Sequence, residues 1–266
     1  MSGNMNFSPR GPNYADLAGK VAVVTGGGRG IGKAIAARLA REGVKVALAG
    51  RTPEALRATA EEIRAAGGSA EAIPADIARP EDVDALFAAA TDRLGPIDIL
   101  VNNAARMVSS PDTLALPDAE WREYVATNVN GAFYCTGRAG RAMAGRGGVI
   151  VNISTIGAFR SHYGMLAYDI TKAAMDSLTR TTGIDLIRHG IRVNAVAPGR
   201  THAREPYRPG PDEVRRRIPI ARAAHAEEIA SVVAFLASSE SSYIVAQTLI
   251  VDGGLSVQLT PPGEFV

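Results

Sequence analysis

In the segment Val21–Gly32, VAVVTGGGRGIG, an apolar run leads directly into a cluster of glycines. The first five residues lack polar alternation, which predicts a strand buried on both faces. Apolar residues at helical spacing follow from Gly32 to Gly43, so the glycines lie between a strand and a helix. Glycine lets the backbone approach a pyrophosphate closely, and a helix N-terminus supplies unpaired N–H groups. The stretch therefore predicts a phosphate cradle.

The spacing of this cradle is Gly26-x-x-x-Gly30-x-Gly32, which differs from the G-x-G-x-x-G of many dinucleotide-binding proteins. A glycine-rich turn without any ligand is the alternative interpretation, because short glycine patterns often occur by chance. The position directly after the first expected strand favours the cradle.

Outside this stretch, short apolar runs alternate with amphipathic segments along the rest of the chain. Such an alternation predicts a Rossmann-type α/β fold, in which a doubly wound parallel sheet of about seven strands lies between two helical layers. We expect the strands at Val21–Thr25, Val44–Ala49, Ser69–Ala75, Ile97–Val101, Gly148–Ser154, Ile191–Val196 and Thr248–Val251. We expect the helices at Gly32–Gly43, Pro53–Ala66, Pro80–Leu94, Ala119–Met143, Tyr168–Ile187 and Ala226–Leu236.

The composition is that of a globular protein, with 46% apolar and 21% charged residues among 266. Residues 1–16 are polar and read as a flexible lead-in, whereas residues 17–266 contain no linker and read as a single domain for dinucleotide binding and catalysis. The irregular segment Arg200–Pro211 predicts a functional or mobile loop.

Charge and cysteine content narrow the class of partner and the compartment. A net charge of +2 gives no reason to expect a nucleic acid, and no apolar run reaches the ~20 residues that would cross a membrane. A single cysteine, Cys135, excludes an internal disulfide and fits the reducing cytoplasm. The four histidines are scattered, so we expect no metal site.

The end of the second expected strand, Leu48-Ala49-Gly50-Arg51, indicates which dinucleotide fits. A carboxylate there would accept hydrogen bonds from the adenosine ribose and favour NAD(H). Instead Arg51, together with Arg29 from the glycine turn, offers guanidinium groups that match a ribose 2′-phosphate. We therefore expect NADP(H), with NAD(H) as the alternative if both arginines are only solvated surface groups.

Three further side chains could carry acid–base chemistry. Tyr168 and Lys172 are four residues apart on an expected helix, which places them on one face. A nearby ammonium favours the phenolate, so we expect Lys172 to lower the pKa of Tyr168 from its usual ~10. Ser154 ends an expected strand, where its hydroxyl could donate to a substrate oxygen that develops negative charge. Taken alone, the Tyr168–Lys172 spacing also fits an exposed tyrosine that packs on a lysine side chain, and Ser154 also fits a serine that hydrogen-bonds within a turn.

In combination these motifs resemble the short-chain dehydrogenase/reductase family, especially its 3-oxoacyl-(acyl-carrier-protein) reductase-like members, from about Lys20 to Leu255. Their order and spacing together are far more specific than any one of them. The matching pieces are Thr25–Gly32, Asp76-Ile77, Asn102–Ala105, Asn128, the strand ending at Ser154, Tyr168–Lys172, Pro198-Gly199 and Asp252–Gly254.

The resemblance implies an enzyme that moves a hydride between NADP(H) and a carbonyl or alcohol carbon. Tyr168 would be the general acid in reduction and the base in oxidation, and Ser154 would polarise the substrate oxygen. Lys172 would hold the nicotinamide ribose, Asn128 would complete a proton relay through water, and Asn102 would steady the central strand. The resemblance implies cofactor contacts from Gly26, Arg29, Gly30, Ile31, Gly32, Arg51, Asp76, Ile77, Asn103, Ala104, Tyr168, Lys172, Pro198, Gly199 and Thr201.

Three departures from the family pattern stand out. Ala105 replaces the usual glycine of the N-N-A-G motif, Thr201 follows Pro198-Gly199 earlier than usual, and Ser154 to Tyr168 is one residue longer than the commonest spacing. The arginine-rich segment Arg200–Arg217 would suit an anionic substrate, although a solvated face on a mobile loop is the favoured explanation.

The expected partners are a small carbonyl or alcohol compound and further copies of the chain. The resemblance suggests a homotetramer or homodimer formed by the helices around Asn128 and Tyr168. An NAD-dependent alcohol, sugar or steroid dehydrogenase of the same family, and a regulator that binds the cofactor without catalysis, remain as alternatives.

Overall fold

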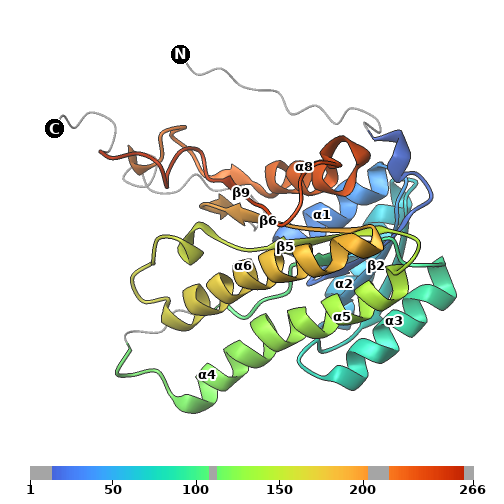
Figure 1. Ribbon diagram of the computed structural model, residues 1–266, viewed down its shortest axis with the longest axis horizontal. Helices are drawn as coiled ribbons and strands as arrows, with labels where there is room; N and C mark the ends of the chain where they lie inside the picture. The colour runs from blue at the N-terminus through green and yellow to red at the C-terminus, as the bar shows by residue number, and fades with distance from the viewer. Residues whose placement is uncertain (1–13, 108–112, 203–215, 261–266) are drawn as a thin grey trace.

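The computed structural model describes residues 14–107, 113–202 and 216–260, and they form the expected α/β architecture (Figure 1). Seven strands form one parallel sheet in the order β3-β2-β1-β4-β5-β6-β9. The predicted Rossmann-type sheet is thereby confirmed. The strands are β1 Val21–Thr25, β2 Lys45–Gly50, β3 Ser69–Pro74, β4 Ile99–Asn102, β5 Gly148–Ile153, β6 Ile191–Pro198 and β9 Thr248–Val251.

Helices cover both faces of this sheet, because each central strand is apolar on both sides. Val24 and Leu48 pack toward α1, α2 and α8, whereas Val23 and Ala47 pack toward α3 and α5. Figure 1 shows α1 and α8 on one side of the sheet and α5 and α6 on the other. The main helices are α1 Gly30–Arg41, α2 Pro53–Ala65, α3 Pro80–Leu94, α4 Asp118–Tyr124, α5 Gly131–Met143, α6 Leu166–Leu186 and α8 Ala226–Ala237.

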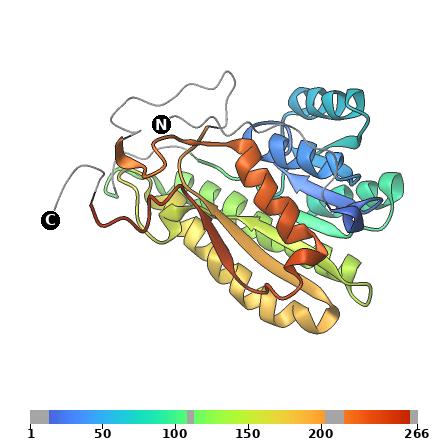
Figure 2. The same ribbon diagram turned by 90° about the horizontal axis from the view of Figure 1, so that it is seen from above.

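Short helical turns complete the connections between these elements. Four of the 3-10 segments among the described residues are η1 Ala15–Leu17, η3 Ile156–Ala158, η4 Ile187–His189 and η5 Ser239–Ser241. Seen from above, β9 lies in red at the side of the molecule away from the blue N-terminal elements (Figure 2). This agrees with the strand order, in which β3 and β9 are the two edges.

The long helix expected at Ala119–Met143 is interrupted by a π-helical segment, Val125–Asn130. A π turn inserts an extra residue into a helix and occurs frequently at functional sites. Here it separates α4 from α5 and buries the Asn128 side chain completely. The apolar periodicity of the sequence could not reveal the interruption, because both flanking segments keep a helical period.

The first described residues pack against the domain. Leu17 is fully buried, and the Tyr14 backbone N–H donates to Glu42 Oε2 at 3.0 Å. Asp16 Oδ2 accepts a hydrogen bond from the Ser239 N–H at 2.8 Å. Residues 14–16 of the expected lead-in are therefore held in place, while residues 1–13 lie outside the described part of the chain.

A second, two-stranded sheet follows the carboxyl end of β6. It pairs β7 Thr201–His202 with β8 Ala224–His225 in parallel. Most of the irregular loop expected at Arg200–Pro211, and three of the six arginines of the segment Arg200–Arg217, lie between β7 and residue 216, outside the described residues. α8 begins directly after β8 with a capping box, in which Glu228 Oε2 accepts from the His225 N–H at 2.8 Å.

Two further findings bear on the class of protein. Within residues 14–107, 113–202 and 216–260, no helix combines the length and the apolar character needed to cross a bilayer. The same residues contain no group of three or more histidine, cysteine or acidic side chains arranged to hold a metal ion.

Candidate active site

The strand order reverses between β1 and β4, and the candidate site lies at the carboxyl ends of these strands. In open parallel sheets the ligand crevice forms at such a switch point. The glycine turn follows β1, Asn103 and Ala104 follow β4, and Ser154 and Thr155 follow β5. Since all neighbouring strands are parallel, their carboxyl ends lie at the same end of the sheet, and these segments meet there.

The glycine turn is packed so closely that side chains are excluded at two positions. Gly26 has φ +69°, and a Cβ there would lie 2.7 Å from Asn103 Nδ2. A Cβ on Gly32 would lie 2.2 Å from the Gly26 carbonyl oxygen. The turn therefore leaves bare backbone at the N-terminus of α1, which begins at Gly30. This cradle fits the pyrophosphate of a dinucleotide, because N–H groups and the helix dipole both favour anions there.

We predict that Gly32→Ala lowers dinucleotide affinity at least about tenfold, since the added methyl group must push the Gly26 carbonyl out of place. Nicotinamide fluorescence titration of the purified variant measures the loss. Gly137→Ala in α5 is the matched control, because its Cβ would meet only the Arg141 side chain at 3.7 Å. Equal affinities for the two variants would contradict the assignment of the cradle.

Asn103 and Ala104 are fastened to the glycine turn through Thr25. Thr25 Oγ1 accepts hydrogen bonds from the N–H groups of Asn103 and Ala104, both at 3.0 Å. Asn103 Nδ2 donates to the Thr25 carbonyl at 2.9 Å. This role of Thr25 was not predicted from the sequence, because a threonine at the end of a buried strand is expected to be a core residue.

Asn102 holds neighbouring elements together, in keeping with the role that the family resemblance implies. Its Nδ2 donates to Asn152 Oδ1 of β5 at 2.9 Å and to Thr136 Oγ1 of α5 at 3.1 Å. These hydrogen bonds connect β4 to the neighbouring strand β5 and to the helix α5.

The other cofactor-binding residues expected from the sequence lie along the same end of the sheet. Asp76 Oδ1 accepts from the Ala78 N–H at 3.1 Å, and Ile77 is buried. Thr201 Oγ1 donates to the Gly199 carbonyl at 3.1 Å, so in this structure the hydroxyl forms a local hydrogen bond within its own turn. Ile31 is partly buried and Pro198 buried, whereas Arg29 and Arg51 are exposed around the cradle.

α6 presents Tyr168 and Lys172 from consecutive turns, as their spacing predicts. Lys172 Nζ lies 5.8 Å from the centre of the Tyr168 ring. The ammonium donates to the Ile153 carbonyl of β5 at 2.5 Å, and the side chain is almost fully buried. Burial lowers the pKa of Lys172 to about 8, although Asp176 raises it.

The structure corrects the expected outcome, a pKa of Tyr168 below its usual ~10. Burial is the largest effect and raises the pKa of Tyr168 to about 12, with further increases from Asp169 and Tyr124. The group that lowers this pKa is the Thr155 hydroxyl, which hydrogen-bonds to the phenol. The physical reason is that the phenol lies in a poorly hydrated position, where burial disfavours the phenolate more than an ammonium 5.8 Å from the ring centre favours it.

The hydroxyl beside Tyr168 thus belongs to Thr155 and not to Ser154. Ser154 Oγ lies 3.5 Å from the Lys172 carbonyl, and the Ser154 side chain also contacts Asp176. Asn152, two residues earlier, likewise faces α6, where its Nδ2 donates to Thr179 Oγ1 at 2.8 Å. Adjacent residues of an extended chain point in opposite directions, so Ser154 points to the middle of α6, at Lys172 and Asp176, and Thr155 points to Tyr168 in the first turn of that helix.

Asn128 braces the segment that follows β4. Its Oδ1 accepts from the Arg106 N–H at 2.7 Å, and its Nδ2 donates to the Arg106 carbonyl at 3.1 Å and to Thr171 Oγ1 at 2.9 Å. These contacts link the π turn, the end of β4 and α6. In the structure the side chain therefore positions backbone, and the relay through water stays a prediction.

Comparisons with known proteins agree with this arrangement. A sequence model of the enoyl-(acyl carrier protein) reductase family matches residues 26–256. A sorbitol dehydrogenase of Cereibacter sphaeroides is 40% identical over 254 residues, which cover 90% of this chain and 98% of the relative. The chain belongs to the short-chain dehydrogenase/reductase family. It is accordingly an oxidoreductase, as the names of its relatives indicate.

Other members of the short-chain dehydrogenase/reductase family are similarly close. A 3-oxoacyl-(acyl-carrier-protein) reductase of Staphylococcus aureus is 38% identical over 248 residues, covering 89% of this chain and 98% of that protein. A solved structure of an actinorhodin polyketide ketoreductase variant with NADPH has a TM-score of 0.85 and 35% identity, covering 90% of this chain and 98% of that one. A short-chain dehydrogenase/reductase from Mycobacterium marinum gives the same TM-score at 34% identity, covering 91% and 97%.

Thr155 is a second residue of this short-chain dehydrogenase/reductase, after Thr25, that was not predicted from the sequence. One signal could have revealed it. Ser154 precedes Tyr168 by one residue more than the commonest spacing of the family, so Thr155 stands at that spacing. A threonine hydroxyl donates and accepts as a serine hydroxyl does.

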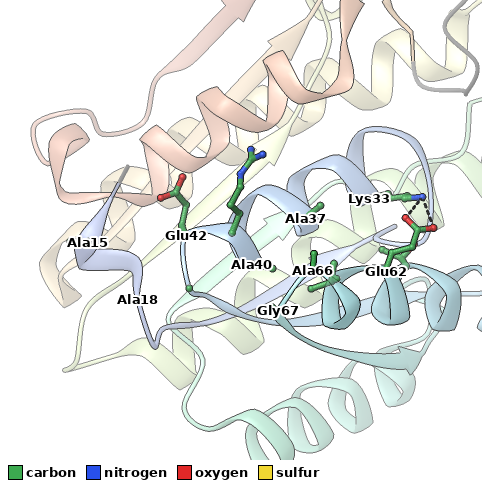
Figure 3. Close-up of a pocket in the computed structure, with 14 residues that line it drawn as sticks. Ala15, Ala18, Lys33, Ala37, Ala40, Glu42, Glu62, Ala66 and Gly67 are labelled. Carbon is green, nitrogen blue, oxygen red and sulfur yellow. Dashed lines mark hydrogen bonds and ion pairs between the residues drawn. The ribbon is translucent and has the colours of Figure 1, made fainter. Parts of the chain in front are cut away.

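A separate surface hollow lies between α1 and α2 (Figure 3). Gly43 and Gly68, which line it, precede β2 and β3, so it reaches the amino ends of these strands. Lys33 and Glu62 form an ion pair of 2.7 Å beside it (Figure 3). None of the acid–base residues lines this hollow, which is therefore distinct from the candidate active site.

Proposed function

We propose that this short-chain dehydrogenase/reductase is an NADP(H)-dependent enzyme that interconverts a small carbonyl compound and its alcohol. The observation that carries the proposal is the convergence of the Tyr168 phenol, the Thr155 hydroxyl and the Lys172 ammonium beside the glycine cradle. The nicotinamide cofactor, when bound, supplies or accepts the hydride. The residues of the chain would bind it, orient the substrate and move one proton.

In the direction of reduction, Tyr168 donates its phenolic proton to the substrate oxygen. A phenol whose pKa is about 12 remains protonated at neutral pH, so it is ready to act as the acid. Thr155 donates a hydrogen bond to the same oxygen while negative charge develops there. The positive charge of Lys172 stabilises the phenolate that remains. Oxidation of an alcohol uses the same groups in reverse.

We infer a preference for NADP(H) from the end of β2. Gly50-Arg51 offers no carboxylate for a ribose diol, whereas Arg51 after β2 and Arg29 within the glycine turn are exposed cations. The similar actinorhodin polyketide ketoreductase variant was solved with NADPH, which supports the same choice. NAD(H) remains the alternative cofactor.

Replacement of Arg51 tests this preference. We predict that Arg51→Ala lowers kcat/KM with NADPH about tenfold and leaves kcat/KM with NADH unchanged, because one charged hydrogen bond to phosphate contributes about 1.5 kcal/mol or more. Arg57→Ala is the control, since Arg57 pairs with Glu54 on exposed α2. A wild-type enzyme that prefers NADH would overturn the proposal.

The second candidate is a dehydrogenase that works oxidatively with NAD on a sugar, alcohol or steroid. The names of two relatives, sorbitol dehydrogenase and 3β-hydroxysteroid dehydrogenase, favour it. The names of two others, a ketoacyl reductase and a 3-oxoacyl-(acyl-carrier-protein) reductase, favour the reductive direction. A panel of ketones, ketoesters, polyols and acyl thioesters, followed at the nicotinamide absorbance with both cofactors, separates these possibilities.

The third candidate, a cofactor-binding regulator without catalysis, is the least favoured. All three acid–base groups are present, and two of them, Thr155 and Lys172, are buried at the site. Burial of the Lys172 ammonium carries a free-energy cost that its hydrogen bond to the Ile153 carbonyl only partly offsets, which favours a role for its charge. Turnover with any substrate of the panel excludes a purely regulatory protein.

We also propose a homotetramer or homodimer, formed through α5 and α6. Large apolar side chains of these helices are exposed, including Phe133 at 58% and Ile184 at 68%. Exposed apolar surface of this kind marks interaction sites. The expected compartment is the cytoplasm, where a single cysteine stays reduced. Burial raises the pKa of Cys135 to about 12, so this thiol is inert.

A further inference from the structure

A buried carboxylate lies one helical turn beyond Lys172 and has no part in the reaction proposed above. Asp176 is only 3% exposed and belongs to the interior of α6. Its Oδ2 has no hydrogen-bond partner within the part of the chain that the structure describes. Burial of a carboxylate with an unpaired oxygen is costly unless a nearby charge compensates for it.

The surroundings of Asp176 come from three elements. Thr248 Oγ1 of β9 donates to Asp176 Oδ1 at 3.1 Å, and Ser154 at the end of β5 lies beside the carboxylate. Burial raises the pKa of Asp176, whereas Ser154 and Thr248, and then the charges of Arg180 and Lys172, lower it. Two hydroxyls and two cations thus favour the ionised carboxylate.

The end of β5 contacts both members of the Lys172–Asp176 pair. The Ile153 carbonyl accepts from Lys172 Nζ at 2.5 Å, and the next residue, Ser154, faces Asp176. Lys172 and Asp176 are four residues apart on α6, so they share one face of the helix. The contacts that β5 and β9 make with the pair are one carbonyl and two hydroxyls, none of which is charged.

We propose that Asp176 is a positioning residue which, held by Ser154 and Thr248, forms a buried counter-charge that keeps Lys172 an ammonium beside Tyr168. The inference rests on the function proposed above, in which Lys172 must carry its charge. Burial lowers the pKa of Lys172 to about 8, and the carboxylate raises it from what burial alone would give. Without that carboxylate, Lys172 would lose its proton closer to neutral pH, and the stabilisation of the Tyr168 phenolate would be lost with it.

The charge of Lys172 can be measured on the protein alone. The chain has four lysines, Lys20, Lys33, Lys45 and Lys172, so an NMR titration of protein labelled with ¹³Cε-lysine has few signals to assign. Lys172→Met identifies the signal of interest. We expect Lys172 to titrate near pH 8 in the wild type and about one pH unit lower in Asp176→Asn, because a close opposite charge raises the pKa of an amine by about that amount or more.

The matched control is Thr179→Val, which removes an equally buried hydrogen bond between α6 and β5 without changing any charge. It should lower the melting temperature and leave the titration of Lys172 in place. If Lys172 titrates at the same pH in Asp176→Asn as in the wild type, Asp176 has only a structural role and the inference is wrong.

A second variant covers the case in which Asp176→Asn does not fold. Thr248→Val removes the hydroxyl that stabilises the Asp176 carboxylate, so Lys172 should shift in the same direction by a smaller amount. An unchanged titration in Thr248→Val would then count against the inference. In an active enzyme, the alkaline fall of kcat/KM should move to lower pH with the NMR titration. Since the titration needs neither substrate nor cofactor, it stands even if the proposed reaction fails.

Discussion

Tyr168→Phe should abolish turnover while leaving dinucleotide binding intact. The substitution removes one oxygen atom, and with it the only proton that the proposed mechanism delivers to the substrate. General acid–base catalysis commonly contributes about 10²- to 10⁴-fold, so we expect kcat to fall about a thousandfold. Steady-state kinetics on the best substrate of the panel measures the loss, and nicotinamide fluorescence titration measures the binding.

The fold should tolerate this change, because the phenol of Tyr168 has Thr155 as its hydrogen-bonding neighbour and the ring is retained. Tyr243→Phe is the control, since that side chain is fully exposed, far from the end of the sheet that carries the site. Normal turnover by Tyr168→Phe would show that another group supplies the proton.

Thr155→Val should reduce kcat about 10²- to 10³-fold, the loss that follows removal of one donor to a developing oxyanion. The substitution keeps the shape of the side chain and deletes the hydroxyl that hydrogen-bonds to Tyr168. It also deletes the acceptor of the Gly157 N–H, which caps η3 at 3.2 Å, so the free energy of unfolding should fall by about 1 kcal/mol. Thr155→Ser should restore most of both losses.

Ser154→Ala provides the decisive contrast. Its hydroxyl contacts the Lys172 carbonyl and Asp176 and not the Tyr168 phenol, so we expect kcat to stay within about tenfold of the wild type, well short of the loss of an oxyanion donor. In Ser154→Ala the alkaline fall of kcat/KM should also move slightly to lower pH, because Ser154 supports the charge of Asp176. If Ser154→Ala is the inactive variant and Thr155→Val the active one, the assignment of the hydroxyl made from the structure is wrong.

Much of the fold could be predicted because it depends on local patterns. Continuous apolar runs such as Val21–Thr25 indicate strands buried on both faces, and the glycines that follow indicate close backbone packing. The pair Tyr168 and Lys172 could be placed on one face from helical spacing alone. Each of these inferences uses only residues near one another in the sequence.

The choice between two adjacent hydroxyls could not be made in this way. Ser154 and Thr155 follow the last residue of β5, where side chains alternate between opposite directions. Which of them meets Tyr168 depends on how α6 packs against β5, a contact between distant segments. The same packing decides the pKa of Tyr168, because burial raises this pKa although the Lys172 ammonium lies nearby.

Periodicity and backbone freedom are local properties, and they were enough to predict the parallel sheet, the glycine cradle, and a phenol and an ammonium on one helix face. Three other features result from contacts between distant segments: Thr155 faces the phenol, a π turn buries Asn128, and Asp176 lies buried beside Lys172. These features arise where separate elements meet, and burial there changes both the direction of side chains and the free energy of their charges.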